Sequence, residues 1–250
     1  MPYILYNLGG SLANVISSVL CFILLIPCEN IEWLSTLLMV LGCIGIFYAI
    51  INGVPLNVGD VSNDGYNVLS FGKKKEALYS LWVQLKTNEQ LVKGKRLKDI
   101  PDDWLYMPKD TENVMISTIG VCYANRLLDM QDFENTSATI EELFEQDYAM
   151  INLYKQLLTC DQIYCYLMTD KSIDDIYNKE LKQFMKQMKK FPAVLRTQYA
   201  IELCYNHDEN KAETVLKDFH KIAPKYPYSG DIESEYELIG IVKSNINNRR

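Results

Sequence analysis

The chain has 250 residues and a formal net charge of −7, and its first 59 residues carry only two charged side chains, Glu29 and Glu32. An acidic chain lacks the clustered positive field of nucleic-acid-binding proteins, and no motif of that class is present, so nucleic acid is excluded as a partner. Charged residues become frequent from Lys73 onward. We therefore divide the chain into an apolar region, residues 1–72, and a charged region, residues 73–250.

Two uncharged apolar segments, Tyr3–Pro27 and Trp33–Ile51, follow one another with a short polar turn between them. Each is close to the ~20 residues that a helix needs to cross the ~30 Å hydrocarbon core of a bilayer. A signal peptide would need a basic start, but no Lys or Arg precedes Lys73. A buried hairpin of a soluble protein is the other interpretation, and two such segments in succession disfavour it. The pattern predicts a transmembrane helical hairpin.

Three consecutive lysines, Lys73–Lys75, follow the second apolar segment, whereas the turn between the segments carries only Glu29 and Glu32. Basic residues beside a membrane span stay on the cytoplasmic side. The pattern therefore predicts a multi-pass protein of the cell membrane, in which both the N-terminus and the region 73–250 are cytoplasmic.

The first apolar segment is rich in small residues near its start, in the stretch GGSLANVISS. Small side chains let a second helix approach closely in lipid. Asn14 is a polar residue at membrane depth and needs a hydrogen-bonding partner there. We therefore expect Gly9, Gly10 and Asn14 to pack against another membrane helix.

The stretch NGVPLNVGDVSNDG, Asn52–Gly65, interrupts the apolar pattern directly after the second segment. Pro and Gly break a helix, and irregular backbone at membrane depth is tolerated where it lines a cavity. The same residues also suit an ordinary turn at the end of a membrane helix, because Asn, Asp and Gly favour turns. Composition alone leaves both interpretations open.

Two short patterns in this region resemble the site-2-type intramembrane zinc metallopeptidases. The first is a Gly-Gly pair with a nearby Asn before an apolar span, as in residues 9–14. The second is Asn-x-x-Pro followed by Asp-Gly, matched here by Asn52, Pro55, Asp64 and Gly65. The resemblance implies that residues 1–72 are the C-terminal part of such a membrane region.

In that family the Asp of Asp-Gly is the third zinc ligand, and the two His of an HExxH helix are the others, with the Glu of that helix as general base. The resemblance therefore assigns a zinc ligand to Asp64, and a loop-shaping role to the Asn, Pro and Gly of the same motif. Asp60 lies nearer the spacing that is usual in the family. Because Val61 rather than Gly follows Asp60, we favour Asp64.

The HExxH helix is missing from this sequence, and the two histidines, His207 and His220, lie far downstream outside any such motif. A catalytic zinc takes three protein ligands, so one carboxylate cannot hold it. We therefore expect zinc only with a partner or upstream segment that supplies HExxH, and no catalytic residue in this chain. The expected function is an incomplete or degenerate metallopeptidase, inactive as an isolated chain. The alternative is a non-enzymatic, membrane-anchored adaptor.

The charged region shows the periodicity of an all-α domain. A Tyr-Ala pair, a polar turn and a second amphipathic helix follow Gly120, and the same pattern follows Arg196, with a stretch of similar outline between them. Three helix-turn-helix units at a spacing of roughly 35 to 40 residues resemble a degenerate tetratricopeptide array, in which each hairpin buries a face on the next. We expect a cytoplasmic helical-repeat domain that binds a cytosolic protein or peptide.

Other conspicuous residues of this region are interpreted as structural. Tyrosines at helical positions, such as Tyr164 and Tyr199, are expected to pack in the core. The seven cysteines form no CxxC pair and no zinc-site spacing, so we expect reduced thiols. The stretch KELKQFMKQMKK is expected to present a solvated helix face, and a membrane-surface role for Phe184, Met185 and Met188 is the alternative.

Overall fold

The computed structural model describes residues 2–58 and 61–249. Regular structure in this part of the chain is helical except for two strands of two residues each, which confirms the predicted all-α class. The chain forms two compact units, residues 1–79 and 80–250. The division falls inside helix α4 (Lys75–Val92), a few residues beyond the boundary predicted from the change in composition.

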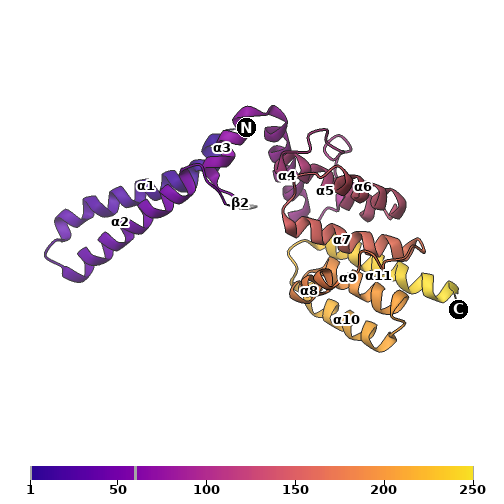
Figure 1. Ribbon diagram of the computed structural model, residues 1–250. Coiled ribbons are helices and arrows are strands. Elements are labelled where there is room, and N and C mark those ends of the chain that lie inside the picture. The colour runs from indigo at the N-terminus through magenta and orange to yellow at the C-terminus, as the bar shows by residue number, and fades with distance from the viewer. Residues whose placement is uncertain (1, 59–60, 250) are drawn as a thin grey trace. The chain divides into compact units, whose positions relative to one another are not determined.

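The first unit is built on a helical hairpin of α1 (Tyr3–Cys28) and α2 (Glu32–Gly53) (Figure 1). The two helices have 26 and 22 residues. At 1.5 Å per residue they are about 39 and 33 Å long, which exceeds the ~30 Å of a bilayer core. Both helices are therefore long and apolar enough to span a membrane, as the sequence predicted.

The fully buried residues of α1 and α2 are small or polar, and the ring of Phe22 on α1 packs against Gly42 on α2. The buried residues are Asn7, Ser11 and Ser18 on α1, and Gly42 and Ala49 on α2. Large apolar side chains of both helices are exposed instead, among them Leu5, Ile16, Ile23, Leu41 and Phe47. The core helix of a soluble protein buries such side chains, whereas a hairpin in lipid turns them outward. This distribution supports association with a membrane.

A short loop and helix α3 (Asp64–Lys73) close the end of the hairpin at which α1 begins and α2 ends. Strand β1 (Asn57–Val58) pairs antiparallel with β2 (Val61–Ser62) in this loop. Helix α3 packs against α1, where the rings of Tyr3 and Phe71 meet edge to face with their centroids 6.3 Å apart. Helix α3 is therefore held against the start of α1 and the end of α2.

The second unit is a succession of helices, joined by short loops except for the longer connections between α4 and α5 and between α7 and α8 (Figure 1). The short 3-10 helices η1 (Leu97–Asp99) and η3 (Ala223–Lys225) and the π-helical turn η2 (Ile201–Tyr205) lie between the longer elements. After α4, the longer helices are α5 (Val114–Asp129), α6 (Phe133–Glu145), α7 (Asn152–Met168), α8 (Lys179–Gln187), α9 (Pro192–Ala200), α10 (Glu209–Ile222) and α11 (Ser229–Arg249).

These helices pack in the order of the chain. Helix α5 packs on α6, α6 on α7, α7 on α9, and α9 on both α10 and α11. Helices α5, α7, α9 and α11 begin at residues 114, 152, 192 and 229, which is a spacing of roughly 40 residues, typical of helical-hairpin repeats. The pairs α5–α6, α7–α8 and α9–α10 are the three expected helix-turn-helix units. Their relation to tetratricopeptide repeats stays a prediction.

Polar residues at the helix starts explain where several of these helices begin. Asn113, Asp132, Asn178 and Asp208 precede α5, α6, α8 and α10, and each side chain accepts a hydrogen bond from a backbone N–H of the first turn. Such caps satisfy N–H groups that have no partner inside the helix. Local sequence therefore sets these boundaries.

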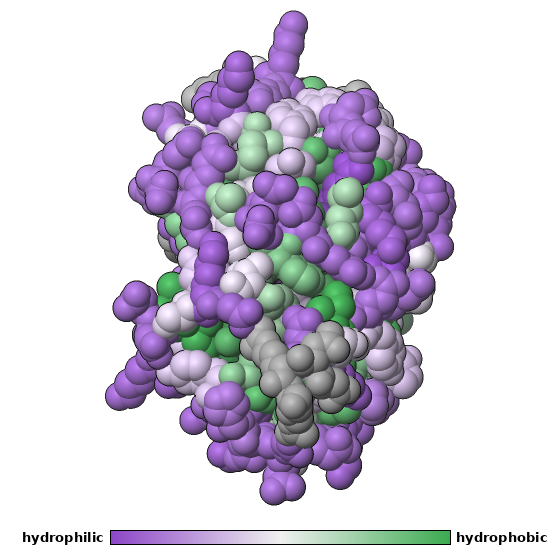
Figure 2. Space-filling model, turned by 90° about the vertical axis from the view of Figure 1, so that its right-hand side faces the viewer, coloured by the Kyte–Doolittle hydropathy of each residue, from purple (hydrophilic) through white to green (hydrophobic). Residues whose placement is uncertain are grey.

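The main core of the second unit forms around α7, α9, α10 and α11. Tyr164 and Tyr199 are buried in it, as predicted. Met185 of α8 is buried as well, and the partly buried Phe184 and Met188 pack against the same core, so the three residues contribute to packing. The face of this unit in Figure 2 is mainly hydrophilic, with apolar residues only in small groups. All seven cysteines are free thiols.

Candidate functional site

The loop between α2 and α3 is organised by one side chain, Asn63. Its Oδ1 accepts hydrogen bonds from the backbone N–H groups of Leu56 (2.9 Å) and Tyr66 (3.0 Å). Its Nδ2 donates to the carbonyl oxygens of Ile51 and Val54, both at 2.5 Å. Asn63 therefore caps the start of α3 and the end of α2 at the same time. The Asp-Gly pair that follows it is thereby held against the end of α2.

Gly65 makes a backbone contact that no larger residue fits. A Cβ at this position would clash with the carbonyl group of Gly53, lying 2.8 Å from its carbon, and would lie 3.0 Å from the nitrogen of Pro55. Because only glycine lacks a Cβ, it alone allows the backbone to approach this closely. Gly65 thus fixes the separation between α3 and the end of α2.

Asp64 is the first residue of α3, and its side chain is half-buried. In the part of the chain that the structure describes, its carboxylate has no hydrogen bond or ion pair. A carboxylate in the first turn also interacts favourably with the helix dipole. Asn52 is half-buried at the end of α2, and Pro55 follows that helix. Asp60 lies outside the described residues.

The residues around Asp64 do not complete a metal centre. Among residues 2–58 and 61–249, no group of three His, Cys, Asp or Glu side chains is placed to hold a metal ion. A catalytic zinc takes three protein ligands, so the donor set of the described chain does not fit zinc by itself. His207 and His220 are exposed residues of the second unit, and His220 stacks on Tyr236.

The predicted packing residues of α1 fall into two groups. No atom of another element lies within 4 Å of the position of a Cβ on Gly9 or Gly10, so a packing role for them with a helix outside this hairpin stays a prediction. Asn14 lies at the contact with α2, where its carbonyl oxygen would be 3.1 Å from a Cβ on Gly45. The hydroxyl of Ser18 also fills the space beside Gly45.

A cavity of about 280 Å³ inside the second unit is the other candidate site. Apolar side chains such as Leu91, Leu157 and Phe191 form part of its wall. Five helices, α4, α5, α7, α9 and α11, contribute most of its polar residues, which are Thr87, Asn125, Asp129, Asp161, Arg196, Asp231, Ser234 and Glu235, and Tyr226 lies in the segment before α11. The sequence did not predict this cavity.

Arg196 is a completely buried residue at the wall of this cavity. Its guanidinium is 2.6 Å from Oδ1 of Asp161 and 3.0 Å from Oε2 of Glu235, and it lies 4.5 Å from the ring centroid of Tyr164. A buried charge is tolerated when it is paired in this way. The arginine thereby joins α9 to both α7 and α11.

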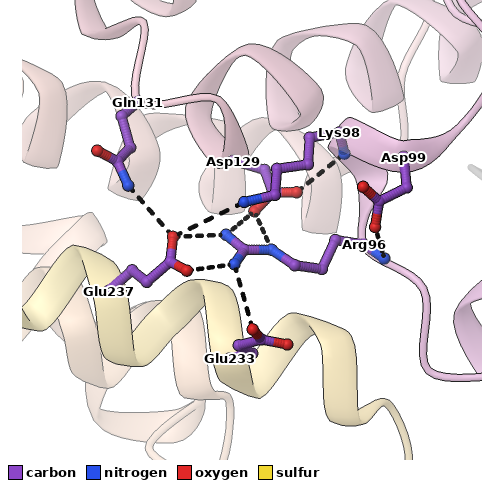
Figure 3. Close-up of polar contacts among 7 residues, drawn as sticks. All are labelled: Arg96, Lys98, Asp99, Asp129, Gln131, Glu233 and Glu237. Carbon is purple, nitrogen blue, oxygen red and sulfur yellow. Dashed lines mark hydrogen bonds and ion pairs between the residues drawn. The ribbon is translucent and has the colours of Figure 1, made fainter.

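A second buried arginine, Arg96, joins the segment after α4 to α5 and α11 (Figure 3). It lies 2.6 Å from Asp129, 2.5 Å from Glu237 and 3.9 Å from Glu233. Asp129 also accepts a hydrogen bond from the backbone N–H of Lys98 at 2.9 Å. The charge of Asp129, which lines the cavity, is therefore matched by Arg96.

Asp231 is the one cavity carboxylate for which no basic partner is found in the described residues. Burial, together with the negative charges of Glu235 and Asp129, raises the pKa of Asp231 to about 6. Four carboxylates and a single arginine line the cavity. The cavity therefore has an excess of negative charge and of hydrogen-bond acceptors.

Comparison with protein-family models, with curated proteins and with solved structures finds no match for this chain. The resemblance to site-2-type metallopeptidases therefore rests on the motif residues alone. The structure shows that Asn63 and Gly53, which are not part of the motif, also hold the motif residues in place. An Asn directly before an acidic helix start is itself a capping signal.

Proposed function

We propose that residues 1–72 are the C-terminal portion of a site-2-type intramembrane metallopeptidase that is incomplete or degenerate in this chain. In this proposal Asp64 is the one zinc ligand that the chain contributes, and an HExxH-bearing segment of a partner or upstream region supplies the others. The isolated chain is inactive. Zinc would be its cofactor only within such an assembly.

The loop geometry supports this proposal. Four hydrogen bonds of Asn63 and the close backbone contact of Gly65 hold Asp64 in a fixed place at the end of α2. The Asp64 carboxylate has no partner in the described chain, which leaves its oxygens available to a ligand. An ordinary turn needs only part of this structure.

Zinc stoichiometry tests the proposal. The full chain is co-purified with a membrane segment that carries HExxH, and bound zinc and substrate cleavage are measured. We expect stoichiometric zinc that Asp64→Asn removes and that the matched variant Asp60→Asn retains, because three ligands are needed. Tight zinc in the isolated chain, or zinc that depends on Asp60 instead, would contradict the assignment. No zinc in any pairing would leave the adaptor as the better function.

The second unit supports that alternative function, a membrane-anchored adaptor that binds a cytosolic protein or peptide. Its helical hairpins leave a cavity to which five helices contribute, and stacked hairpins commonly bind peptides in this way. Cross-linking in intact cells tests it, with a chain truncated after Tyr79 as the control. A partner that is cross-linked equally to both chains would contradict an adaptor role for residues 80–250.

A further inference from the structure

Two polar atoms at the cavity wall lack a hydrogen-bonding partner in the described chain. Thr87 is only 4% exposed, and its hydroxyl is unpaired. The Oδ1 of Asn125 is buried and accepts no hydrogen bond. Both residues line the cavity. Because buried polar atoms in folded proteins are nearly always paired, these two indicate a polar ligand in the cavity. The Oδ1 of Asn125 can only accept, so this ligand has to donate a hydrogen bond to it.

The negative charge of the cavity wall indicates that the ligand is positively charged. Arg196 is already committed to Asp161 and Glu235, and Asp129 is paired with Arg96. Asp231 is left without a basic partner in the described residues and lies close enough to Glu235 and Asp129 to feel their charge. An anion entering this cavity would be repelled, whereas a cation would relieve the repulsion between the carboxylates.

The size and walls of the cavity select the shape of the ligand. A volume of about 280 Å³ lies just below the range for small-molecule sites, roughly 300–1,000 Å³, and suits a small group such as one long side chain. The apolar residues Leu91, Leu157 and Phe191 line it together with the carboxylates. An aliphatic stem with a cationic head matches both surfaces, since Lys and Arg bury their stems in this way. A divalent metal fits less well, because no three ligating groups of the described residues converge.

We propose that this cavity binds an alkyl guanidinium or alkyl ammonium group, whose head lies among Asp231, Thr87 and Asn125 and whose stem contacts the apolar wall. The group belongs either to an Arg or Lys side chain of a peptide or to a free amine of the same chemistry. In the peptide case it is the anchor of the partner, so this case rests on the adaptor function proposed above.

Calorimetric titration of the full chain in detergent micelles tests the proposal. Three probes are used: butylguanidine as a free alkyl guanidinium, a blocked Gly-Arg-Gly peptide, and butylurea as the neutral analogue of butylguanidine. We expect at least one cationic probe to bind and the neutral analogue not to bind. Asp231→Asn and Thr87→Val each remove one contact with the ligand. We expect Asp231→Asn to raise Kd roughly tenfold or more, and Thr87→Val to raise it severalfold.

Asp175→Asn is the matched control, because Asp175 is an exposed carboxylate outside the cavity, and it should leave Kd unchanged. Thr87→Val is nearly isosteric and changes no charge, so it tests the same cavity independently of Asp231→Asn. Binding of butylguanidine but not of the peptide would retain the cation site and remove its support for the adaptor. Binding of neither cation, equal binding of the neutral analogue, or binding unaffected by both cavity variants would overturn the proposal.

Discussion

At the residue scale, the amide of Asn63 holds the loop after α2 through both of its polar atoms. An Asp at this position would keep the acceptor for Leu56 and Tyr66 but lose both donors, and it would set a negative charge beside the carbonyl oxygens of Ile51 and Val54. We predict that Asn63→Asp destabilises the loop by about 2 kcal/mol. Hydrogen–deuterium exchange of the peptide covering the loop measures this change.

Asn178 provides the matched control, because its Oδ1 accepts from the backbone N–H of Leu181 at 2.9 Å as the N-cap of α8. Asp is as good an N-cap as Asn, so Asn178→Asp should change local stability by less than about 0.5 kcal/mol. Equal acceleration of exchange at the two sites would show that the two donor bonds of Asn63 contribute little.

The carboxyl group of Asp231 predicts a dependence of stability on pH. Its pKa is raised to about 6 by burial and by Glu235 and Asp129, while Arg196 is paired with Asp161 and Glu235. Because the folded pKa lies above the unfolded one, the folded state retains a proton that the unfolded state releases. The stability contributed by this group is therefore present below about pH 4 and is lost as pH rises through about 6.

Replacing Asp231 by Asn removes the loss of stability that accompanies ionisation of this carboxyl group. We predict that Asp231→Asn is more stable than the native chain at pH 7.5, by up to about 3 kcal/mol, and that the difference disappears near pH 4. The free energy of unfolding in urea, measured in detergent micelles at the two pH values, tests this. A difference that does not change with pH would contradict the burial of an ionised carboxylate at this position.

At the scale of elements, the seam between α1 and α2 depends on small side chains. A Cβ on Gly45 would clash with the hydroxyl of Ser18 and lie 3.1 Å from the carbonyl oxygen of Asn14. We predict that Gly45→Leu separates the two helices at a cost of about 1–3 kcal/mol. Faster hydrogen–deuterium exchange along α1 and α2 in micelles would report the loss of packing.

Gly10→Leu is the matched control for this element, because nothing lies within 4 Å of a Cβ on Gly10. The isolated chain should tolerate it. If Gly10→Leu disturbs an assembly with a second membrane protein but leaves the isolated hairpin intact, the predicted packing of Gly10 with an outside helix gains its first support. Disruption of the isolated hairpin would instead show that Gly10 packs against α2.

The elements could be predicted from sequence to different degrees. Apolar runs and helical periodicity revealed the hairpin and the three helix-turn-helix units, because both signals are local. The capping role of Asn63 is also a local signal, because an Asn before an acidic helix start is a typical N-cap. The Asp-Gly motif, however, predicts a role for Asp64 and not for Asn63. The cavity could not be predicted from the sequence, because Asp161, Arg196 and Asp231 are far apart in the chain and meet only when α7, α9 and α11 pack.

At the scale of the whole molecule, the two units distribute apolar residues in opposite ways. The hairpin exposes large apolar side chains such as Ile16 and Phe47 and buries Ser11 and Ser18, whereas the second unit buries residues such as Tyr164. The first arrangement suits lipid and the second suits water. We therefore expect the full chain to resist carbonate extraction from membranes, as a helical hairpin inserted in the bilayer does.

The basic residues after α2 predict the orientation of the chain in the membrane. Lys73, Lys74 and Lys75 lie 20 to 22 residues beyond the end of α2 at Gly53, and no other Lys or Arg lies between Met1 and α3. Basic residues within about 15–20 residues of a span determine which side stays cytoplasmic. A reporter fused after Arg250 should therefore report the cytoplasm, and replacing the three lysines by Glu should weaken or scramble that orientation.

Three lysines of the second unit supply the control for this last prediction. Lys186, Lys189 and Lys190 are exposed and lie far along the chain from α2, so replacing them by Glu changes the net charge equally without touching the flank of a span. The positive-inside effect is local, and this variant should therefore keep the native orientation. An external signal from the unmodified fusion would overturn the assignment. Equal scrambling by both triple variants would mean that overall charge, and not the lysines beside α2, determines the topology.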